Sequence, residues 1–187
     1  RIPEGWDITL SDLSPGMLKE AQDNLQVIHR LFRYEVIDIQ AIPFEDGVFD
    51  AVIANHMLYH VPDRAKALSE IYRVLKPSGS FYAGTNGRAA PSGSVGFRDW
   101  IVDPITCKGS EGFSLETGGS ELSQWFSVVT QHRYEDSLAV TEVKPLIDYV
   151  RSGKRLSAEE VQEFEKVVER EIASHGVIHI PKSAGGF

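Results

Sequence analysis

The sequence has little of three features that mark particular classes of protein: cysteine, basic charge and long apolar runs. Cys107 is the only cysteine among 187 residues, which rules out a disulfide within this chain and a cysteine-rich metal site. The net charge of −8, without a dense basic run, disfavours nucleic-acid binding. No stretch approaches the roughly 20 apolar residues of a membrane-spanning helix. We therefore expect no nucleic acid, membrane or metal as partner, and a reducing, cytoplasmic setting.

The rest of the composition is that of a folded domain, because 42% of the residues are hydrophobic. We expect a single domain over residues 1–187. Its first half alternates strand-like and helix-like patterns. The expected strands cover residues 7–12, 34–37, 49–55 and 80–85, the expected helices residues 14–28 and 63–74, and the expected turns residues 43–47 and 76–79. This alternation predicts an α/β fold with a parallel, doubly wound sheet.

Two of the predicted strands end at an aspartate, Asp12 and Asp38. In an open α/β sheet, ligands bind outside the carboxyl ends of the strands. A carboxylate at such a place accepts hydrogen bonds from both hydroxyls of a ribose, or from the amine of an adenine. The two strand ends therefore predict a nucleoside pocket.

The second half of the sequence has a different texture. Residues 86–124 are rich in glycine and serine, and we interpret them as an inserted cap segment over the site, with a short amphipathic helix around residues 95–105. A strand over 128–141 and a helix over 143–150 follow. Ser157 and Glu160 fit a capping box at the start of another helix. A last strand at 177–180 precedes a tail of small residues.

Five segments of the first half occur in a family's order and spacing. They read DLSPGML at 12–18, Asp38 before IPF at 42–44, FDAVIAN at 49–55, HVPD at 60–63 and RVLKPSG at 73–79. Together they resemble a class I S-adenosylmethionine-dependent methyltransferase of the ubiquinone/menaquinone-biosynthesis type, often called methyltransferase type 11. The resemblance covers about residues 5–87 and implies a Rossmann-like doubly wound sheet.

The resemblance also implies a cofactor, S-adenosylmethionine, and residues that bind it. Asp12 would bind the two ribose hydroxyls, with Leu13 against the adenine. Asp38 would accept a hydrogen bond from the adenine amine, and the backbone of Ile39 would contact the edge of the ring. The alternative for both aspartates is that they only form turns or cap helices.

The end of the third predicted strand supplies the remaining candidates. By the resemblance, Asn55 and His56 would border the methionine part of the cofactor and its methyl group. His56, Tyr59 and His60 are the candidate catalytic residues, as general bases toward a phenol or a protonated amine. The alternative is that these side chains are structural.

One part of the family pattern is absent from the sequence. The first strand and its glycine-rich loop should precede Arg1, and the chain also starts without methionine or the pattern of a signal peptide. That strand lies in the middle of the family's sheet, between the strands that end at Asp12 and Asn55, so its loss would expose two inner edges. We expect an N-terminally truncated piece of a longer protein, which in isolation rearranges its sheet, associates with another copy of itself or binds the cofactor poorly.

The predicted function is S-adenosylmethionine-dependent methyl transfer to a small-molecule acceptor. One alternative is a nicotinamide-dependent oxidoreductase, because an acid at the end of the second strand also binds ribose in that fold. Another is a non-catalytic module that binds a cofactor or a partner. Asp38 and the turn at 76–79 argue against the oxidoreductase.

Overall fold

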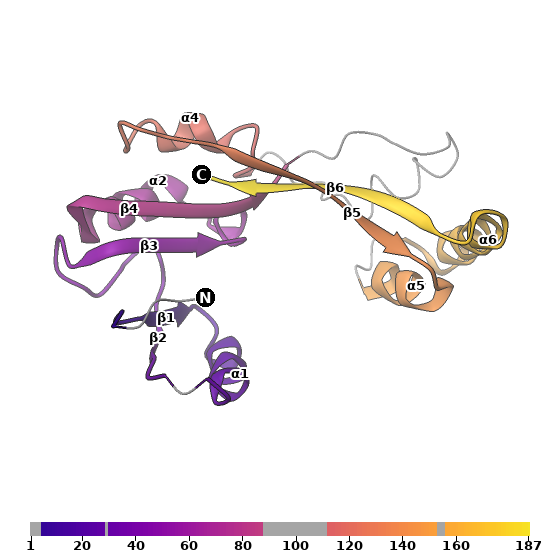
Figure 1. Ribbon diagram of the computed structural model, residues 1–187, viewed down its shortest axis with the longest axis horizontal. Coiled ribbons are helices and arrows are strands. Elements are labelled where there is room, and N and C mark those ends of the chain that lie inside the picture. Colours follow the sequence, from indigo (N-terminus) through magenta and orange to yellow (C-terminus); the bar gives the residue numbers. More distant parts are fainter. Residues whose placement is uncertain (1–4, 29, 88–111, 153–155) are drawn as a thin grey trace. The chain divides into compact units, whose positions relative to one another are not determined.

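The computed structural model describes residues 5–28, 30–87, 112–152 and 156–187. The chain folds into two compact units, Arg1–Val52 with Val61–Phe81 and Ile53–His60 with Tyr82–Phe187 (Figure 1). Strands β3 (Phe49–Asn55) and β4 (Leu75–Asn86) run from the first unit into the second. The amphipathic helix expected around residues 95–105, most of the cap segment 86–124 and Cys107 lie outside the described residues.

The first unit begins with a strand, a helix and a second strand. β1 (Thr9–Asp12) pairs in parallel with β2 (Arg33–Val36), and α1 (Pro15–Leu25) connects them along the chain. The helix starts where the sequence predicts, because the Ser14 hydroxyl accepts the N–H of Met17 and proline suits the first helical position. It ends three residues earlier than predicted, so Ile28 lies outside it and is 45% exposed.

Helix α2 (Arg64–Val74) confirms the second predicted helix. Asp63 caps it by accepting the N–H of Lys66, and one side is buried through Ala67, Leu68, Ile71 and Val74. The predicted turn at residues 76–79 is wrong, because the backbone becomes extended at Leu75 and β4 starts there. Proline stops the helix as expected, but the chain then continues as a strand.

The second unit contains a long antiparallel arrangement. β6 (Ile178–Gly186) pairs antiparallel with β5 (His132–Val140) over nine residue pairs, Val140 with Ile178 to His132 with Gly186. Its last residues also pair antiparallel with β4, where Gly84 lies opposite Gly186. The small-residue tail predicted after residue 180 is therefore wrong, since those residues continue the strand. A short helix, α4 (Gly118–Leu122), precedes β5.

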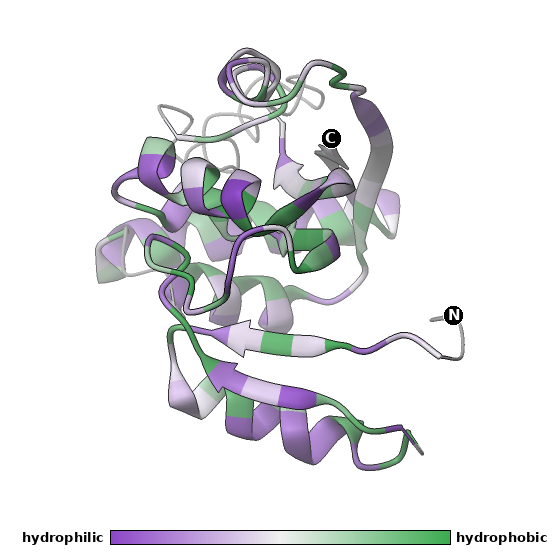
Figure 2. Cartoon of the chain, turned by 90° about the vertical axis from the view of Figure 1, so that its left-hand side faces the viewer, coloured by the Kyte–Doolittle hydropathy of each residue, from purple (hydrophilic) through white to green (hydrophobic). Residues whose placement is uncertain are grey.

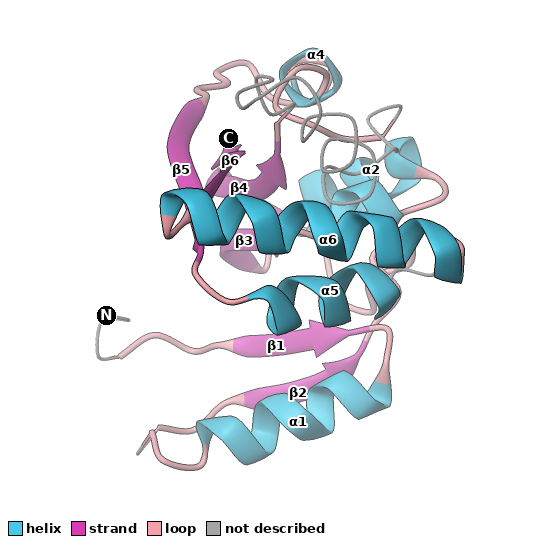
Figure 3. Ribbon diagram, turned by 90° about the vertical axis from the view of Figure 1, so that its right-hand side faces the viewer, coloured by secondary structure: helices cyan, strands magenta, loops and turns pink. Residues whose placement is uncertain are grey.

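Two helices complete this unit. α5 (Val143–Ser152) and α6 (Ala158–His175) lie side by side (Figure 3). The predicted capping box is confirmed, with Ser157 and Glu160 each accepting the other's backbone N–H. The buried side of each helix forms a core with the ends of β5 and β6, made of hydrophobic residues of the kind coloured green in Figure 2. This core contains Val140, Leu146, Ile147, Val150, Val161, Phe164, Val168, Ile178 and Ile180.

The described strands form two sheets, one of order β1-β2 and one of order β3-β4-β6-β5. The α/β class predicted from the sequence is confirmed, and the predicted parallel pairing holds for β1 and β2. The pairing of β6 is antiparallel on both sides, which the sequence did not predict. Among the described strands, β1 pairs only with β2 and β3 only with β4, so each has one edge without a neighbouring strand.

Candidate functional site

The carboxyl ends of β1 and β2 lie at one edge of their sheet. Asp12 is opposite Val36, and its carbonyl accepts the N–H of Ile37 at 3.2 Å. Asp38 follows directly after Ile37, so both aspartates leave the sheet on the same edge. Both are exposed. The structure therefore brings together the two carboxylates that the sequence predicts for a nucleoside pocket.

Asp12 forms a local turn at the start of α1. Its Oδ1 accepts the backbone N–H of Ser14 at 2.8 Å, the hydrogen bond of an Asx turn. An ionised carboxylate has about four acceptor positions on its two oxygens, so this turn leaves most of them for a ligand. Leu13, the residue predicted to lie against the adenine, is 68% exposed at the same turn. The turn-forming role is therefore real and compatible with binding.

Asp38 forms a second Asx turn with the same spacing. Its Oδ1 accepts the backbone N–H of Gln40 at 2.9 Å. The side-chain amide of Gln40 also donates from Nε2 to Oδ1 at 3.1 Å and to Oδ2 at 3.3 Å. These hydrogen bonds, the backbone one first, lower the pKa of Asp38 below its ordinary value, assisted by the charge of Lys66. Ile39, between the two residues, is half-buried.

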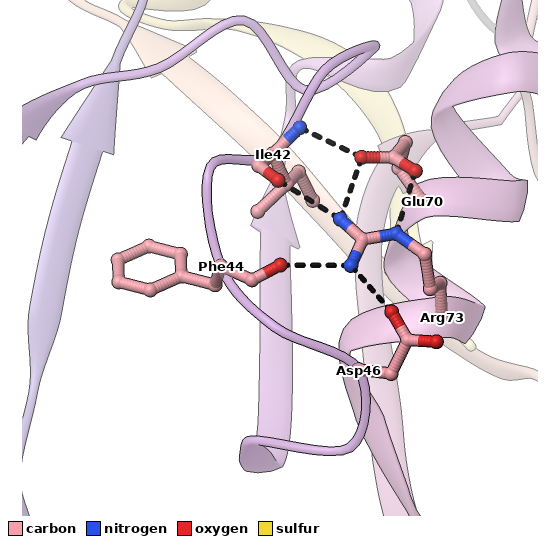
Figure 4. Close-up of polar contacts among 5 residues, drawn as sticks. All are labelled: Ile42, Phe44, Asp46, Glu70 and Arg73. Atoms are coloured by element: carbon pink, nitrogen blue, oxygen red, sulfur yellow. Dashed lines mark hydrogen bonds and ion pairs between the residues drawn. The ribbon is translucent and has the colours of Figure 1, made fainter.

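The turn that follows Asp38 is attached to α2 by one arginine (Figure 4). Arg73 donates to both carboxylate oxygens of Glu70 at 2.8 Å, to the carbonyls of Ile42 at 2.9 Å and Phe44 at 2.7 Å, and to Asp46 at 2.8 Å. Glu70 in turn accepts the N–H of Ile42 at 2.9 Å. A planar guanidinium presents several N–H donors in fixed directions and so suits several acceptors at once. The turn is therefore held in one place.

The electrostatics of this network agree with its geometry. Hydrogen bonds from Arg73 lower the pKa of Glu70, and the carboxylates of Glu70 and then Asp46 raise the pKa of Arg73. The sequence reading did not identify Gln40, Glu70 or Arg73 as parts of the site. The spacing of Glu70 and Arg73 on one helix face was the available signal, but it does not tell which backbone carbonyls the arginine meets.

Asn55 and His56 belong to the second unit, at the end of β3. His56 has a positive φ of 52°, a conformation that is uncommon for a residue with a side chain and that occurs often at functional sites. Its N–H donates to the carbonyl of Gly84 at 2.9 Å. The Asn55 amide lies against Gly84, where a Cβ would collide with Asn55 Oδ1. Both candidate side chains are exposed.

Tyr59 and His60 form part of a short 3₁₀ helix, η1 (Leu58–His60), which is anchored by the buried Leu58. Their rings make an edge contact, with centroids 4.5 Å apart and planes at 60°. His60 is exposed and Tyr59 is half-buried. The structure thus locates the three candidate bases in the second unit, and their catalytic roles stay predictions.

The described residues contain no group of three or more histidine, cysteine, aspartate or glutamate side chains that could hold a metal ion. No helix in the described part of the chain is both long enough and apolar enough to span a membrane.

The comparisons with known proteins concern mainly the first half of the chain. Residues 2–83 match the family model described as a methyltransferase domain. The ubiquinone/menaquinone biosynthesis C-methyltransferase of Pectobacterium atrosepticum is 36% identical over 81 residues, which are 42% of this chain and 32% of that relative. The chain thus spans about a third of the length of this curated relative.

Solved structures extend the likeness of fold to nearly the whole chain. A candidate methyltransferase of Bacillus halodurans C-125 superposes with a TM-score of 0.66 at 18% identity, covering 97% of this chain and 81% of that one. The phosphoethanolamine N-methyltransferase 2 of Haemonchus contortus has a TM-score of 0.52 at 18% identity, covering 97% and 43%. At such identities the likeness concerns the fold alone, which is the Rossmann-like fold predicted. The resemblance noted in the sequence is confirmed for the first half of the chain, where residues 2–83 match the model of a methyltransferase domain.

Proposed function

We propose that the chain binds S-adenosylmethionine and transfers its methyl group to a small-molecule acceptor. The observation that carries this proposal is the pair of exposed carboxylates, Asp12 and Asp38, at one edge of the parallel β1–β2 pair. The pair lies inside the segment that matches the methyltransferase domain. The Pectobacterium relative is named a C-methyltransferase, and the Haemonchus structure was solved with S-adenosylhomocysteine.

The residues at this edge fit an adenosine. Asp12 has acceptor positions left after its turn with Ser14, and these suit the two neighbouring hydroxyls of a ribose. Asp38 is held ionised by its donors, which suits a hydrogen bond from the adenine amine. Leu13 offers an exposed apolar side chain for a face of the base. Two carboxylates also suit an uncharged nucleoside better than a phosphate, because a phosphate is negatively charged as they are.

The cofactor supplies a sulfonium, which already makes its methyl group electrophilic. The protein then has to align the acceptor with the methyl group and exclude water. An acceptor that is a phenol or a protonated amine needs a base as well, and His56, Tyr59 and His60 are the candidates. Asn55 and His56 remain the candidates for contact with the methionine part.

Several finer predictions are part of the same proposal. The cap segment 86–124 is proposed as the wall of the acceptor site, in a domain that covers residues 1–187. A cytoplasmic setting, N-terminal truncation and self-association of the chain also stay predictions. Among the described strands, β1 and β3 each have one unpaired edge, which supports self-association because unpaired edges in a sheet are adhesive.

A thermal-shift experiment tests the cofactor. The chain is heated with S-adenosylhomocysteine, S-adenosylmethionine or NAD⁺, up to millimolar concentrations because poor binding is one of the three outcomes expected for the chain in isolation. We expect the melting temperature to rise with the two sulfur compounds and not with NAD⁺, since a ligand that binds only the folded state stabilises it. A rise with NAD⁺ alone would favour the oxidoreductase. No rise with any of the three ligands would count against cofactor binding and favour a non-catalytic module that binds a partner.

A second experiment tests the reaction. The chain is incubated with S-adenosylmethionine that carries a labelled methyl group, and with phenols, amines and carboxylic acids in turn. Transfer of label to one of these classes supports the proposed activity and identifies the acceptor chemistry. Binding of the cofactor without transfer to any class would reduce the proposal to a cofactor-binding module.

A further inference from the structure

Gln40 lies between the carboxylate of Asp38 and the first residues of α2. Its Nε2 donates to both oxygens of Asp38, at 3.1 and 3.3 Å. At the other end of the same amide, Oε1 accepts the backbone N–H of Asp63 at 3.2 Å. Asp63 caps α2, where its own Oδ1 accepts the N–H of Lys66 at 3.0 Å. One half-buried side chain therefore connects Asp38 to the backbone at the start of a helix.

The contact with Asp63 determines which way the Gln40 amide points. A backbone N–H can only donate, so the amide oxygen has to face Asp63 and the amide nitrogen has to face Asp38. The nitrogen then reaches both carboxylate oxygens and fixes the plane of the carboxylate. Without it, Asp38 would be an exposed side chain held by a single backbone N–H, that of Gln40.

The far end of the same loop is attached to the same helix. Arg73 on α2 holds the carbonyls of Ile42 and Phe44, and Glu70 holds the N–H of Ile42. The loop after β2 is thus attached to α2 at both ends, by Gln40 at the start of the helix and by Arg73 at its end (Figure 4 shows the Arg73 end). The place of Asp38 is consequently set by α2 as well as by β2.

We propose that Gln40 is a positioning residue for adenine recognition: its amide, oriented by the Asp63 backbone, holds the Asp38 carboxylate in the direction that receives the 6-amine. This inference rests on the proposed function, which makes Asp38 an adenine ligand. Gln40 does not itself have to touch the cofactor. Gln40 should therefore affect how strongly the site prefers a purine with a donor at position 6 over a purine with an acceptor there.

The test compares two ligands that differ at position 6 and in the proton that the adjoining N1 carries when position 6 is a carbonyl. S-Adenosylhomocysteine carries an amine there, and S-inosylhomocysteine carries a carbonyl oxygen, which cannot donate to a carboxylate. We expect the wild-type chain to prefer the adenosyl compound by about tenfold or more in Kd, the effect of one hydrogen bond to a charged group. Gln40→Met keeps the length of the side chain without its hydrogen-bonding groups, and we expect it to reduce this preference at least about threefold.

A matched control is available at the end of α1. Its C-cap residue, Gln26, donates from Nε2 to Asp23 at 3.4 Å, at an exposed position. Gln26→Met should leave the preference at the wild-type value. If Gln40 only stabilised the loop, Gln40→Met would lower the affinity for both ligands equally and leave the preference unchanged. An unchanged or increased preference would overturn the inference.

A measurement without ligand separates this inference from the proposed function. The carboxyl carbon of Asp38 is followed by NMR as the pH is lowered, with Lys66 as the neighbouring charge in every variant. Because hydrogen bonds from Gln40 lower the pKa of Asp38, Gln40→Met should raise it, and Gln26→Met should not. If the wild-type chain binds neither ligand, the proposed function fails. If the wild-type chain prefers the adenosyl compound, and Gln40→Met changes neither this preference nor the titration of Asp38, only the positioning role of Gln40 fails. Gln40→Ala is the second variant if Gln40→Met does not fold.

Discussion

Replacing Asp12 by asparagine separates the turn that this side chain forms from the ribose binding that we propose for it. The turn uses Oδ1, which accepts the N–H of Ser14 at 2.8 Å. An asparagine has the same shape and still offers one oxygen to this N–H, so the start of α1 should be preserved. Its second terminal atom is an NH₂ group, which donates and cannot accept from a hydroxyl. The substitution therefore removes acceptor positions from the ribose while leaving the fold in place.

The size of the effect follows from the hydrogen bonds that are lost. A hydrogen bond to a charged group contributes about 1.5–3 kcal/mol, and each 1.4 kcal/mol is a factor of about ten in affinity. Loss of one such bond from a ribose hydroxyl thus predicts a Kd for S-adenosylhomocysteine that is about 10- to 150-fold higher. The melting temperature without ligand should stay close to that of the wild type, since Asp12 is exposed and exposed substitutions usually have small effects.

The assay combines calorimetric titration with thermal unfolding of the unliganded chain. Asp23→Asn is the matched control, because Asp23 is an exposed aspartate in the last turn of α1 that pairs with Lys19. It should bind the ligand as the wild type does. Equal affinity of Asp12→Asn and the wild type would refute the reasoning and leave Asp12 as a turn former only.

Three further predictions concern stability. Phe164→Ala removes a fully buried ring from the core of α5 and α6 and should lower the free energy of unfolding by about 3–5 kcal/mol in urea titrations, whereas a loss below about 1 kcal/mol would contradict this packing. Hydrogen bonds from Ser157 lower the pKa of Glu160 below its ordinary 4.5. The contribution of the Glu160 carboxylate to stability is therefore complete above that value and is lost as the pH falls through the folded-state pKa. The difference in melting temperature between the wild type and Glu160→Gln should shrink over the same fall in pH, and a constant difference would contradict the capping box. Arg73→Lys replaces a planar fork by a point charge and should lower the melting temperature because the contacts with Glu70 and two carbonyls cannot all be kept; an unchanged value would show that this network contributes little.

The elements of the first unit were predictable because their signals are local. Ser14 and Pro15 mark the start of α1, and the buried side of α2 follows from the spacing of its apolar residues. The start of β4 was not predictable in this way. The dipeptide Lys76–Pro77 and the glycine at 79 favour a turn, yet the segment is extended, with Lys76 paired to Asp50 of β3 at 2.8 Å. Pairing with another strand overrides the local preference.

The end of the chain was misread for a related reason. Glycine is unfavourable in strands, so residues 181–187 had no strand signal. In the structure, β6 lies between β4 and β5, and its glycines lie where side chains have no room. A Cβ at Gly185 would collide with the carbonyl of His132, and a Cβ at Gly186 would lie 2.8 Å from the carbonyl of Ala83. The small residues therefore permit this pairing, which only the spatial neighbours reveal.

The same distinction between local and distant signals runs through the candidate site. The sequence predicted Asp12 and Asp38 because each ends a strand, and it left open whether they form turns or bind a ligand. In the structure both form turns, because each carboxylate accepts the backbone N–H of the residue two positions later. Such a bond occupies part of one oxygen and fixes the side chain, and it leaves acceptors pointing away from the backbone. Turn formation is therefore compatible with the binding that we propose for both aspartates. Asp38 differs from Asp12 in its contact with Gln40, and the hydrogen bond of Gln40 with Asp63 spans 23 positions of the sequence, so no local pattern predicts it.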